Sequence, residues 1–161
     1  MKTAWSHLPN AKYIDQVLAS LKAHPQQWAD AWKKSYPNGR TAVWGAAREA
    51  VRDAAREAVR DAAREAVRDA AWDAAWDAVW EAVREAVREA VREAVREAVR
   101  DAAWDVAWDA ILALIAYDDC AYMLDSDVGE LRILAAFGDQ KAILLVPACM
   151  AFNMIKEMEM A

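Results

Sequence analysis

The densest group of chemically reactive side chains lies between residues 118 and 127. Asp118, Asp119 and Cys120 are consecutive, and Asp125 and Asp127 follow. Four carboxylates and a thiol could bind a metal ion, but such a site needs converging ligands with hydrogen-bonding support, and neither histidine is near in the sequence. On a helix, Asp118 and Asp119 would point about 100° apart. We interpret the segment as a polar helix edge that leads into an Asp-capped turn, and we expect no metal.

The two histidines are the next candidates for chemistry. His7 or His24 could pair with a distant carboxylate or with Cys120 in a catalytic arrangement. However, His24 precedes Pro25 at a predicted helix end, where an imidazole more readily interacts with terminal carbonyl groups. The sequence contains no glycine-rich phosphate loop, no Cys-x-x-Cys and no His-Glu-x-x-His. We therefore expect no catalytic residue and no cofactor, and we predict that the protein is not an enzyme.

Tryptophans form the third candidate, an aromatic interaction surface. Trp72, Trp76 and Trp80 are spaced four residues apart, and the stretch between Arg68 and Arg84 carries acidic but no basic side chains. Such a surface could bind a basic peptide, or stack against a cationic or planar ligand. Alternatively, the indoles pack under the terminal helices or against a second copy of the chain. The residues predicted for interaction are Trp72, Trp76, Trp80, Trp104, Trp108 and Leu112.

The tryptophans belong to a repeat of four residues, (Arg or Trp)-(Glu or Asp)-Ala-(Ala or Val). It runs in one frame from Trp44 to Ile111, which is 68 residues or 17 repeats, and residues 84–99 are four identical copies. Ala, Arg and Glu are strong helix formers, and neither Gly nor Pro occurs between Ala46 and Val128. The repeat therefore predicts one long helix, about 41–124, in an all-α fold. The repeat alone would be about 100 Å long.

A period of four does not match the helix period of about 3.6 residues. The Ala/Val stripe therefore advances by about 40° per repeat and circles the helix in about nine repeats. This excludes an ordinary left-handed coiled coil, but the Ala-xxx-Ala rows suit close helix crossings. Carboxylates such as Asp61 and Asp101 share the sector of the tryptophans, so we expect contacts as patches near 72–80 and 104–112. Alternatively, π-type turns straighten the stripe.

Short helices are predicted at both ends of the repeat. Residues 10–23 and 26–34 form an N-terminal hairpin, and Thr41 is a plausible cap for the long helix. After the repeat, larger apolar residues concentrate. Ser126 or Asp127 caps a helix over 127–137 that Gly138 ends, and Asp139 caps a last helix that Pro147 should kink or interrupt. We predict three regions: an N-terminal helical hairpin at 1–40, a tetrapeptide-repeat helix at 41–111 and a C-terminal apolar helical region at 112–161.

Composition limits the partners. The chain has 161 residues, 20 basic and 26 acidic side chains and a net charge of -6, so nucleic acid is a poor partner. The longest uncharged apolar runs have 8 and 11 residues, against about 20 for a bilayer span, and no secretory leader is evident. We expect a soluble cytoplasmic protein that does not bind membranes, with Cys120 and Cys149 as reduced, buried thiols.

The arrangement resembles a loose group of uncharacterised Ala-rich tetrapeptide-repeat proteins of tailed phages and bacteria. The array at 44–111, the segment Ile115-Ala-Tyr-Asp-Asp-Cys-Ala-Tyr-Met-Leu-Asp125 and the segment Gly138-Asp-Gln-Lys-Ala-Ile-Leu-Leu-Val-Pro-Ala-Cys149 carry the resemblance. It covers most of the chain and favours a phage or bacterial setting. It implies no known activity or functional residue.

These observations favour a non-enzymatic interaction or scaffold protein. An isolated rod would leave six indoles in water, so we expect a homo-oligomer, most simply a dimer, held through Ala-xxx-Ala rows and the Trp patches. A separate protein partner is also possible. The alternative function is a small-ligand binding or sequestering protein, whose pocket is made by the Trp patches and the C-terminal helices.

Overall fold

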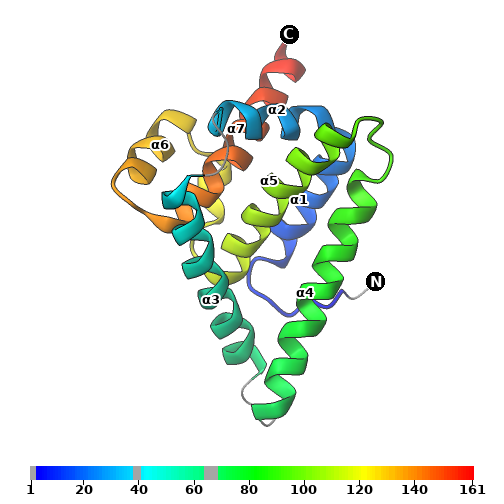
Figure 1. The fold of residues 1–161 in the computed structure, drawn as a ribbon, viewed down its shortest axis with the longest axis vertical. Coiled ribbons are helices and arrows are strands. Elements are labelled where there is room, and N and C mark those ends of the chain that lie inside the picture. The colour runs from blue at the N-terminus through cyan, green and yellow to red at the C-terminus, as the bar shows by residue number, and fades with distance from the viewer. Residues whose placement is uncertain (1–2, 38–40, 64–68) are drawn as a thin grey trace.

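The computed structural model describes residues 3–37, 41–63 and 69–161, with the side chains of residues 69–72 left out. The described residues are mostly helical and contain no strand, which confirms the predicted all-α class. The elements are α1 (Ala11–Ala23), α2 (Pro25–Ser35), α3 (Ala42–Ala63), α4 (Asp69–Val91), α5 (Glu97–Ala116), the 3₁₀ helix η1 (Ala121–Asp125), α6 (Val128–Ala136) and α7 (Gln140–Met160) (Figure 1).

The repeat does not form one long helix, and that part of the expectation is wrong. It is divided among α3, α4 and α5, which have 22, 23 and 20 residues. The chain leaves the helical conformation between Val91 and Glu97, inside the four identical copies. Val95, in this connection, is 95% exposed. In Figure 1, α3 and α4 form the two arms of a V, and α5 runs between them.

The drift of the apolar stripe explains why shorter helices are favoured. The stripe turns by about 40° per repeat, so it faces one side of a helix only over about four or five repeats. α3 and α4, with 22 and 23 residues, are only slightly longer than this, and they pack against each other and against α5. One long rod would leave most of the stripe in water. The buried stripe consists of Ala47, Val51, Ala55 and Val59 in α3, and of Val79, Val83, Val87 and Val91 in α4.

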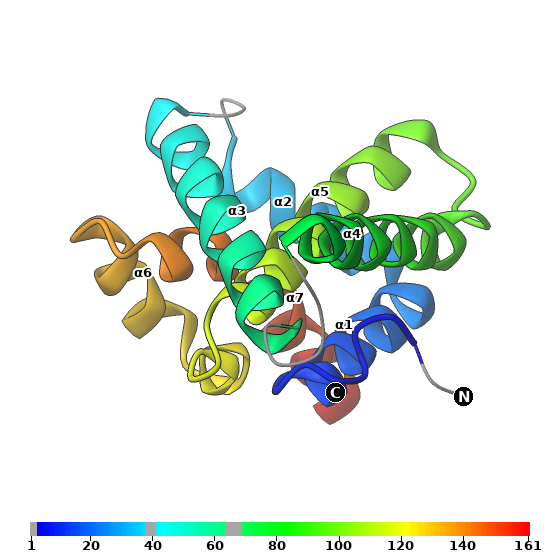
Figure 2. The same cartoon turned by 90° about the horizontal axis from the view of Figure 1, so that it is seen from below.

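α5 is the central helix. It packs against α1, α2, α3, α4 and α7, and every residue from 106 to 115 is buried. This is the end of the repeat at which larger apolar residues replace the arginines. α6 lies at the edge of the molecule, on the far side from α4, in both views (Figure 1, Figure 2). It rests on α7 through Leu131, which is 1% exposed.

The helix ends that local chemistry predicts are confirmed. Thr41 Oγ1 accepts a hydrogen bond from the backbone N–H of Trp44 at 3.1 Å, at the start of α3. Asp127 Oδ1 accepts from Gly129 N–H at 2.7 Å and begins α6, and Asp139 Oδ1 accepts from Ala142 N–H at 3.1 Å and begins α7. Gly138 has φ 86°, a left-handed conformation suited to glycine, between these two helices.

Pro147 does not interrupt α7, contrary to one of the two outcomes that we expected. Because proline has no N–H, the carbonyl of Ile143, four residues earlier, has no helical donor. The hydroxyl of Tyr36 donates to this carbonyl at 3.0 Å, from the end of α2. A distant side chain thus replaces the missing backbone donor, and the helix continues to Met160.

The helix that follows the repeat is also shorter than expected. α5 ends at Ala116 instead of continuing to about Leu124, and the 3₁₀ helix η1 occupies part of the remaining stretch. None of the helices in the described part of the chain is both long and apolar enough to cross a membrane.

Candidate functional site

The structure brings the two predicted Trp patches against each other. Trp80 of α4 meets Trp108 of α5 edge-on, with ring centroids 4.4 Å apart and an angle of 89°. Trp76 extends this contact on α4, and Trp104 stacks on Trp108 at 5.9 Å and 12°. Trp76, Trp108 and Leu112 are buried, at 6%, 4% and 2% exposure, and Trp80 and Trp104 are partly buried. The side chain of Trp72 lies outside the described residues.

The described indoles pack α4 against α5 within one chain. The space between the described side chains around Trp76, Trp80, Trp108 and Leu112 is about 10 Å³, room for about one water molecule. The guanidinium of Arg52 covers the face of Trp80 from α3 at 4.8 Å. These contacts account for the described tryptophans by packing between two helices of the repeat, whereas the sequence suggested packing under the terminal helices or against a second copy.

The sequence interpretation missed a buried carboxylate. Asp109 of α5 is 1% exposed. Its Oδ2 accepts a hydrogen bond from the indole N–H of Trp44 at 2.9 Å, and its Oδ1 lies 3.1 Å from Nε of Arg48. Asp109 is the only charged residue between 106 and 115, and a lone acid in an apolar stretch is the signal that could have identified it.

An aromatic cluster joins this ion pair to the end of α2. The rings of Trp32 and Tyr36 lie 4.8 Å apart, and those of Trp32 and Trp44 lie 5.8 Å apart. Burial, and next the charge of Asp109, raise the pKa of Tyr36 above its ordinary value. The hydroxyl therefore stays protonated and continues to donate to Ile143.

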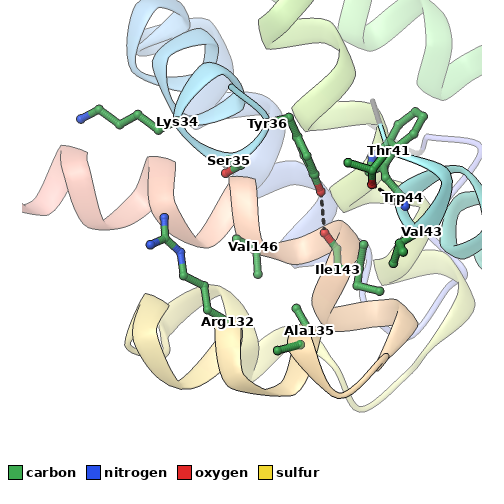
Figure 3. A pocket seen from close by; sticks show the side chains of 11 residues that line it. Lys34, Ser35, Tyr36, Thr41, Val43, Trp44, Arg132, Ala135, Ile143 and Val146 are labelled. Carbon is green, nitrogen blue, oxygen red and sulfur yellow. Dashed lines mark hydrogen bonds between the residues drawn. The ribbon is translucent and has the colours of Figure 1, made fainter. Parts of the chain in front are cut away.

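Beside this cluster lies an open groove of about 460 Å³. The end of α2 and the start of α3 form one wall, α6 forms the other, and α7 forms the floor (Figure 3). In Figure 3, Lys34 and Arg132 lie toward one end of the groove, and Val43 and Ile143 lie toward the other. The described lining residues are Lys34, Ser35, Tyr36, Thr41, Val43, Trp44, Arg132, Ala135, Ala136, Ile143 and Val146, none of which is acidic.

The sequence analysis did not identify this groove. Lys34 and Arg132 are separated by almost a hundred residues and belong to different predicted regions. Neither forms an ion pair within the described part of the chain. Lys34 and Arg132 therefore give one end of the groove a positive charge on a net acidic protein, and the remaining lining is largely apolar.

The cluster at residues 118–127 does not converge on one point. Asp118 and Asp119 are exposed and line a different groove, of about 810 Å³, with Glu57 and Asp61 of α3, whereas Cys120 is buried. Among the described residues, no group of three or more His, Cys, Asp or Glu side chains is arranged to hold a metal ion. His24 lies between α1 and α2, at the predicted helix end.

Both cysteines are buried free thiols, as predicted. Cys120 donates to the carbonyl of Ala113 at 3.4 Å, and Cys149 donates to that of Ser126 at 3.1 Å. Burial is the largest cause that raises the pKa of Cys120 to about 12 and that of Cys149 to about 11. Because the thiolate is the reactive form, neither side chain is suited to nucleophilic chemistry.

The outer face of α6, together with its C-cap residue Phe137, carries large apolar side chains that are exposed. Ile133 and Phe137 lie one turn apart and are 59% and 85% exposed, and Leu134 beside them is 40% exposed. Side chains of this size are seldom left in water on one face of a helix without a partner.

Comparison of the chain with protein-family models, with curated proteins and with solved structures found no match. The resemblance to Ala-rich repeat proteins of phages and bacteria stays a prediction.

Proposed function

We propose that this chain is a non-enzymatic interaction or scaffold protein that associates with a second copy of itself through the outer face of α6. The exposure of Phe137 and Ile133 is the observation that carries the proposal. Trp76, Trp108 and Leu112 are already buried within one chain, so they have little surface left for a partner. We therefore assign the interaction surface to the outer face of α6 instead of to the Trp patches.

The outer face of α6 has a pattern that fits a copy of itself. Gly129, Ile133 and Phe137 follow one another at intervals of four and form one row. In an antiparallel pair of α6 helices centred on Ile133, Phe137 of each copy lies over Gly129 of the other. A large side chain thus meets a residue without one, which is the self-complementarity that a two-fold contact needs.

Charge and burial also favour this contact. One acid, Glu130, and one base, Arg132, flank the row, so the two faces meet without net repulsion although each chain carries a net charge of -6. Burying a phenylalanine side chain contributes about 1.5–3 kcal/mol, and a symmetric contact buries two. The two free buried thiols favour a reducing compartment, and we propose a cytoplasmic protein.

Replacing the apolar pair on α6 tests the proposal. Light scattering during size exclusion should give a dimer mass for the natural chain and a monomer mass for Ile133→Ser/Phe137→Ser. Both side chains are exposed in one chain, so the variant should keep its fold, which circular dichroism can check. Val95→Ser removes an exposed apolar group elsewhere and should leave the dimer intact. A monomeric natural chain, or an unchanged mass in the double variant, would contradict the proposal.

The alternative function, binding of a small ligand, rests on a different place. The space between the described tryptophans holds about one water, whereas the groove beside α6 has about 460 Å³. The C-terminal helices α6 and α7 contribute to that groove as the alternative predicted, whereas the described residues of the predicted Trp patches do not line it.

A further inference from the structure

We propose that the groove between the end of α2, the start of α3 and the helices α6 and α7 binds a small amphipathic anion, with one carboxylate or phosphate head and a short apolar tail. The groove volume of about 460 Å³ lies within the range of small-molecule sites. This proposal does not require the α6 contact, although Arg132, which flanks the apolar row of α6, also lines the groove. Arg132, Ala135 and Ala136 line the groove, whereas Ile133 and Phe137 lie about 100° further round the helix.

The positive charge at one end of the groove indicates that the head of the ligand is an anion. Lys34 and Arg132 lie toward one end of the groove (Figure 3), and no acidic side chain is among the described lining residues. Elsewhere in the described chain, Arg48, Arg60 and Lys156 each lie within 4 Å of a carboxylate. A guanidinium binds carboxylate or phosphate with two N–H donors, and a lysine adds a second positive charge.

The apolar lining at the opposite end of the groove indicates that the ligand has a hydrocarbon tail. Ile143 and Val146 of α7 form the floor, and Val43 of α3 closes the far end (Figure 3). Ala135 and Ala136 on α6 are small, which leaves space above this floor. A ligand with charge at one end and hydrocarbon at the other would therefore match the groove along its length, while a fully polar anion would leave the apolar end unfilled.

The walls of the groove are held in place by hydrogen bonds of residues that line it and of their neighbours. Tyr36 is hydrogen-bonded to the carbonyl of Ile143, and Trp44 is hydrogen-bonded to buried Asp109. Asp127 fixes the start of α6, the helix that carries Arg132. Because these contacts are made by the protein's own groups, little ordering is required on binding, and this favours affinity.

Isothermal titration calorimetry with three probes of equal chain length tests both ends of the groove. Decanoate and decyl phosphate should bind, and uncharged decanol should bind at least about tenfold more weakly, because it lacks the charge-assisted hydrogen bonds. The tighter of the two anions identifies the head. Equal binding of all three probes, or no binding of the anions at millimolar concentration, would overturn the proposal.

Variants at exposed positions locate the site. Arg132→Gln should weaken decanoate binding by about tenfold and leave decanol binding unchanged. Lys33→Gln makes the same kind of charge change beside the groove, on an exposed residue that does not line it, and should have no effect. Val43→Asp should weaken all three probes. If Arg132→Gln and Lys33→Gln behave alike, the anion binds elsewhere and the assignment is wrong. The Ile133→Ser/Phe137→Ser variant should bind decanoate normally, which separates this proposal from the α6 contact.

Discussion

Tyr36 occupies the position that a backbone amide fills in an ordinary helix. Its hydroxyl donates to the carbonyl of Ile143, which Pro147 leaves without a donor. Tyr36 and Pro147 are distant in the sequence, yet each provides for a hydrogen-bonding requirement that the other creates. Pro147 gives Tyr36 an acceptor, and Tyr36 keeps a carbonyl next to the core from being unsatisfied.

This dependence predicts a coupling between two substitutions. Tyr36→Phe should lower the free energy of unfolding by about 1–2 kcal/mol in the natural chain, because it leaves the Ile143 carbonyl without a partner. In a Pro147→Ala chain, the amide of residue 147 can donate instead, and Tyr36→Phe should cost clearly less. Urea denaturation of the four proteins measures the difference. Additive effects would mean that the hydrogen bond contributes no stability.

The buried thiols predict a loss of stability at high pH. In the unfolded chain a cysteine has a pKa near 9.0, whereas in the folded chain Cys120 and Cys149 have raised pKa values of about 12 and about 11. Above about pH 9 the unfolded chain therefore releases protons that the folded chain retains, and the free energy of unfolding falls as the pH rises.

Urea denaturation between pH 8 and pH 10.5 should show this fall. Cys120→Ala should have a shallower pH dependence than the natural chain, whatever its stability at pH 8, because one group whose pKa is raised by folding is removed. An identical slope in the two proteins would show that Cys120 ionises equally easily in both states.

The segment between α4 and α5 contains no Gly, Pro or capping residue that would mark a turn in the sequence. Residues 92–96 repeat the same Arg-Glu-Ala-Val pattern as the helices on either side. Arg96 is the N-cap of α5, with φ -96° and ψ 133°, yet its side chain makes no capping hydrogen bond. The turn is therefore set by the packing of α4 and α5, and its first helical amides lack the partner that a Ser or Asp would supply.

A capping residue at this position should stabilise the fold. Arg96→Ser should have a free energy of unfolding about 1 kcal/mol higher than Arg96→Ala, since both substitutions remove the charge and only serine can cap α5. Thermal or urea denaturation of the pair measures the difference. If the chain formed a continuous helix through residue 96, the order would reverse, because alanine is the better helix former.

The predictions from sequence succeeded at the helix ends with a local cause. Thr41, Asp127 and Asp139 each cap their helix through a backbone amide two or three residues later, and Gly138 adopts a positive φ. These are contacts between near neighbours, so the sequence contains all the information that they require. The end of α5 at Ala116 has no such signal and was missed.

The whole molecule is compact because its repeat folds back on itself. A compact chain of 161 residues has a radius of gyration of about 15 Å, and a compact dimer about 20 Å. A continuous helix over the repeat would give nearly 30 Å from its length alone, roughly 100 Å divided by √12.

Small-angle scattering of the Ile133→Ser/Phe137→Ser protein should therefore give about 15 Å. The same measurement on the natural chain should give about 20 Å if the α6 contact forms. A value near 30 Å with a monomer mass would mean that α3, α4 and α5 do not pack together in solution.

The sequence by itself determined the all-α class and the positions of the short helices. Helix propensity, capping and apolar spacing act over a few residues, and each can be read along the chain. Tertiary structure decided where the repeat turns, because identical repeats carry no local difference and only packing distinguishes them. It also decided that Asp109 is buried against Arg48 and Trp44, and that Lys34 and Arg132 share a groove. Those relations join residues far apart in the sequence, and no local pattern records which of the many similar arginines and acids will meet.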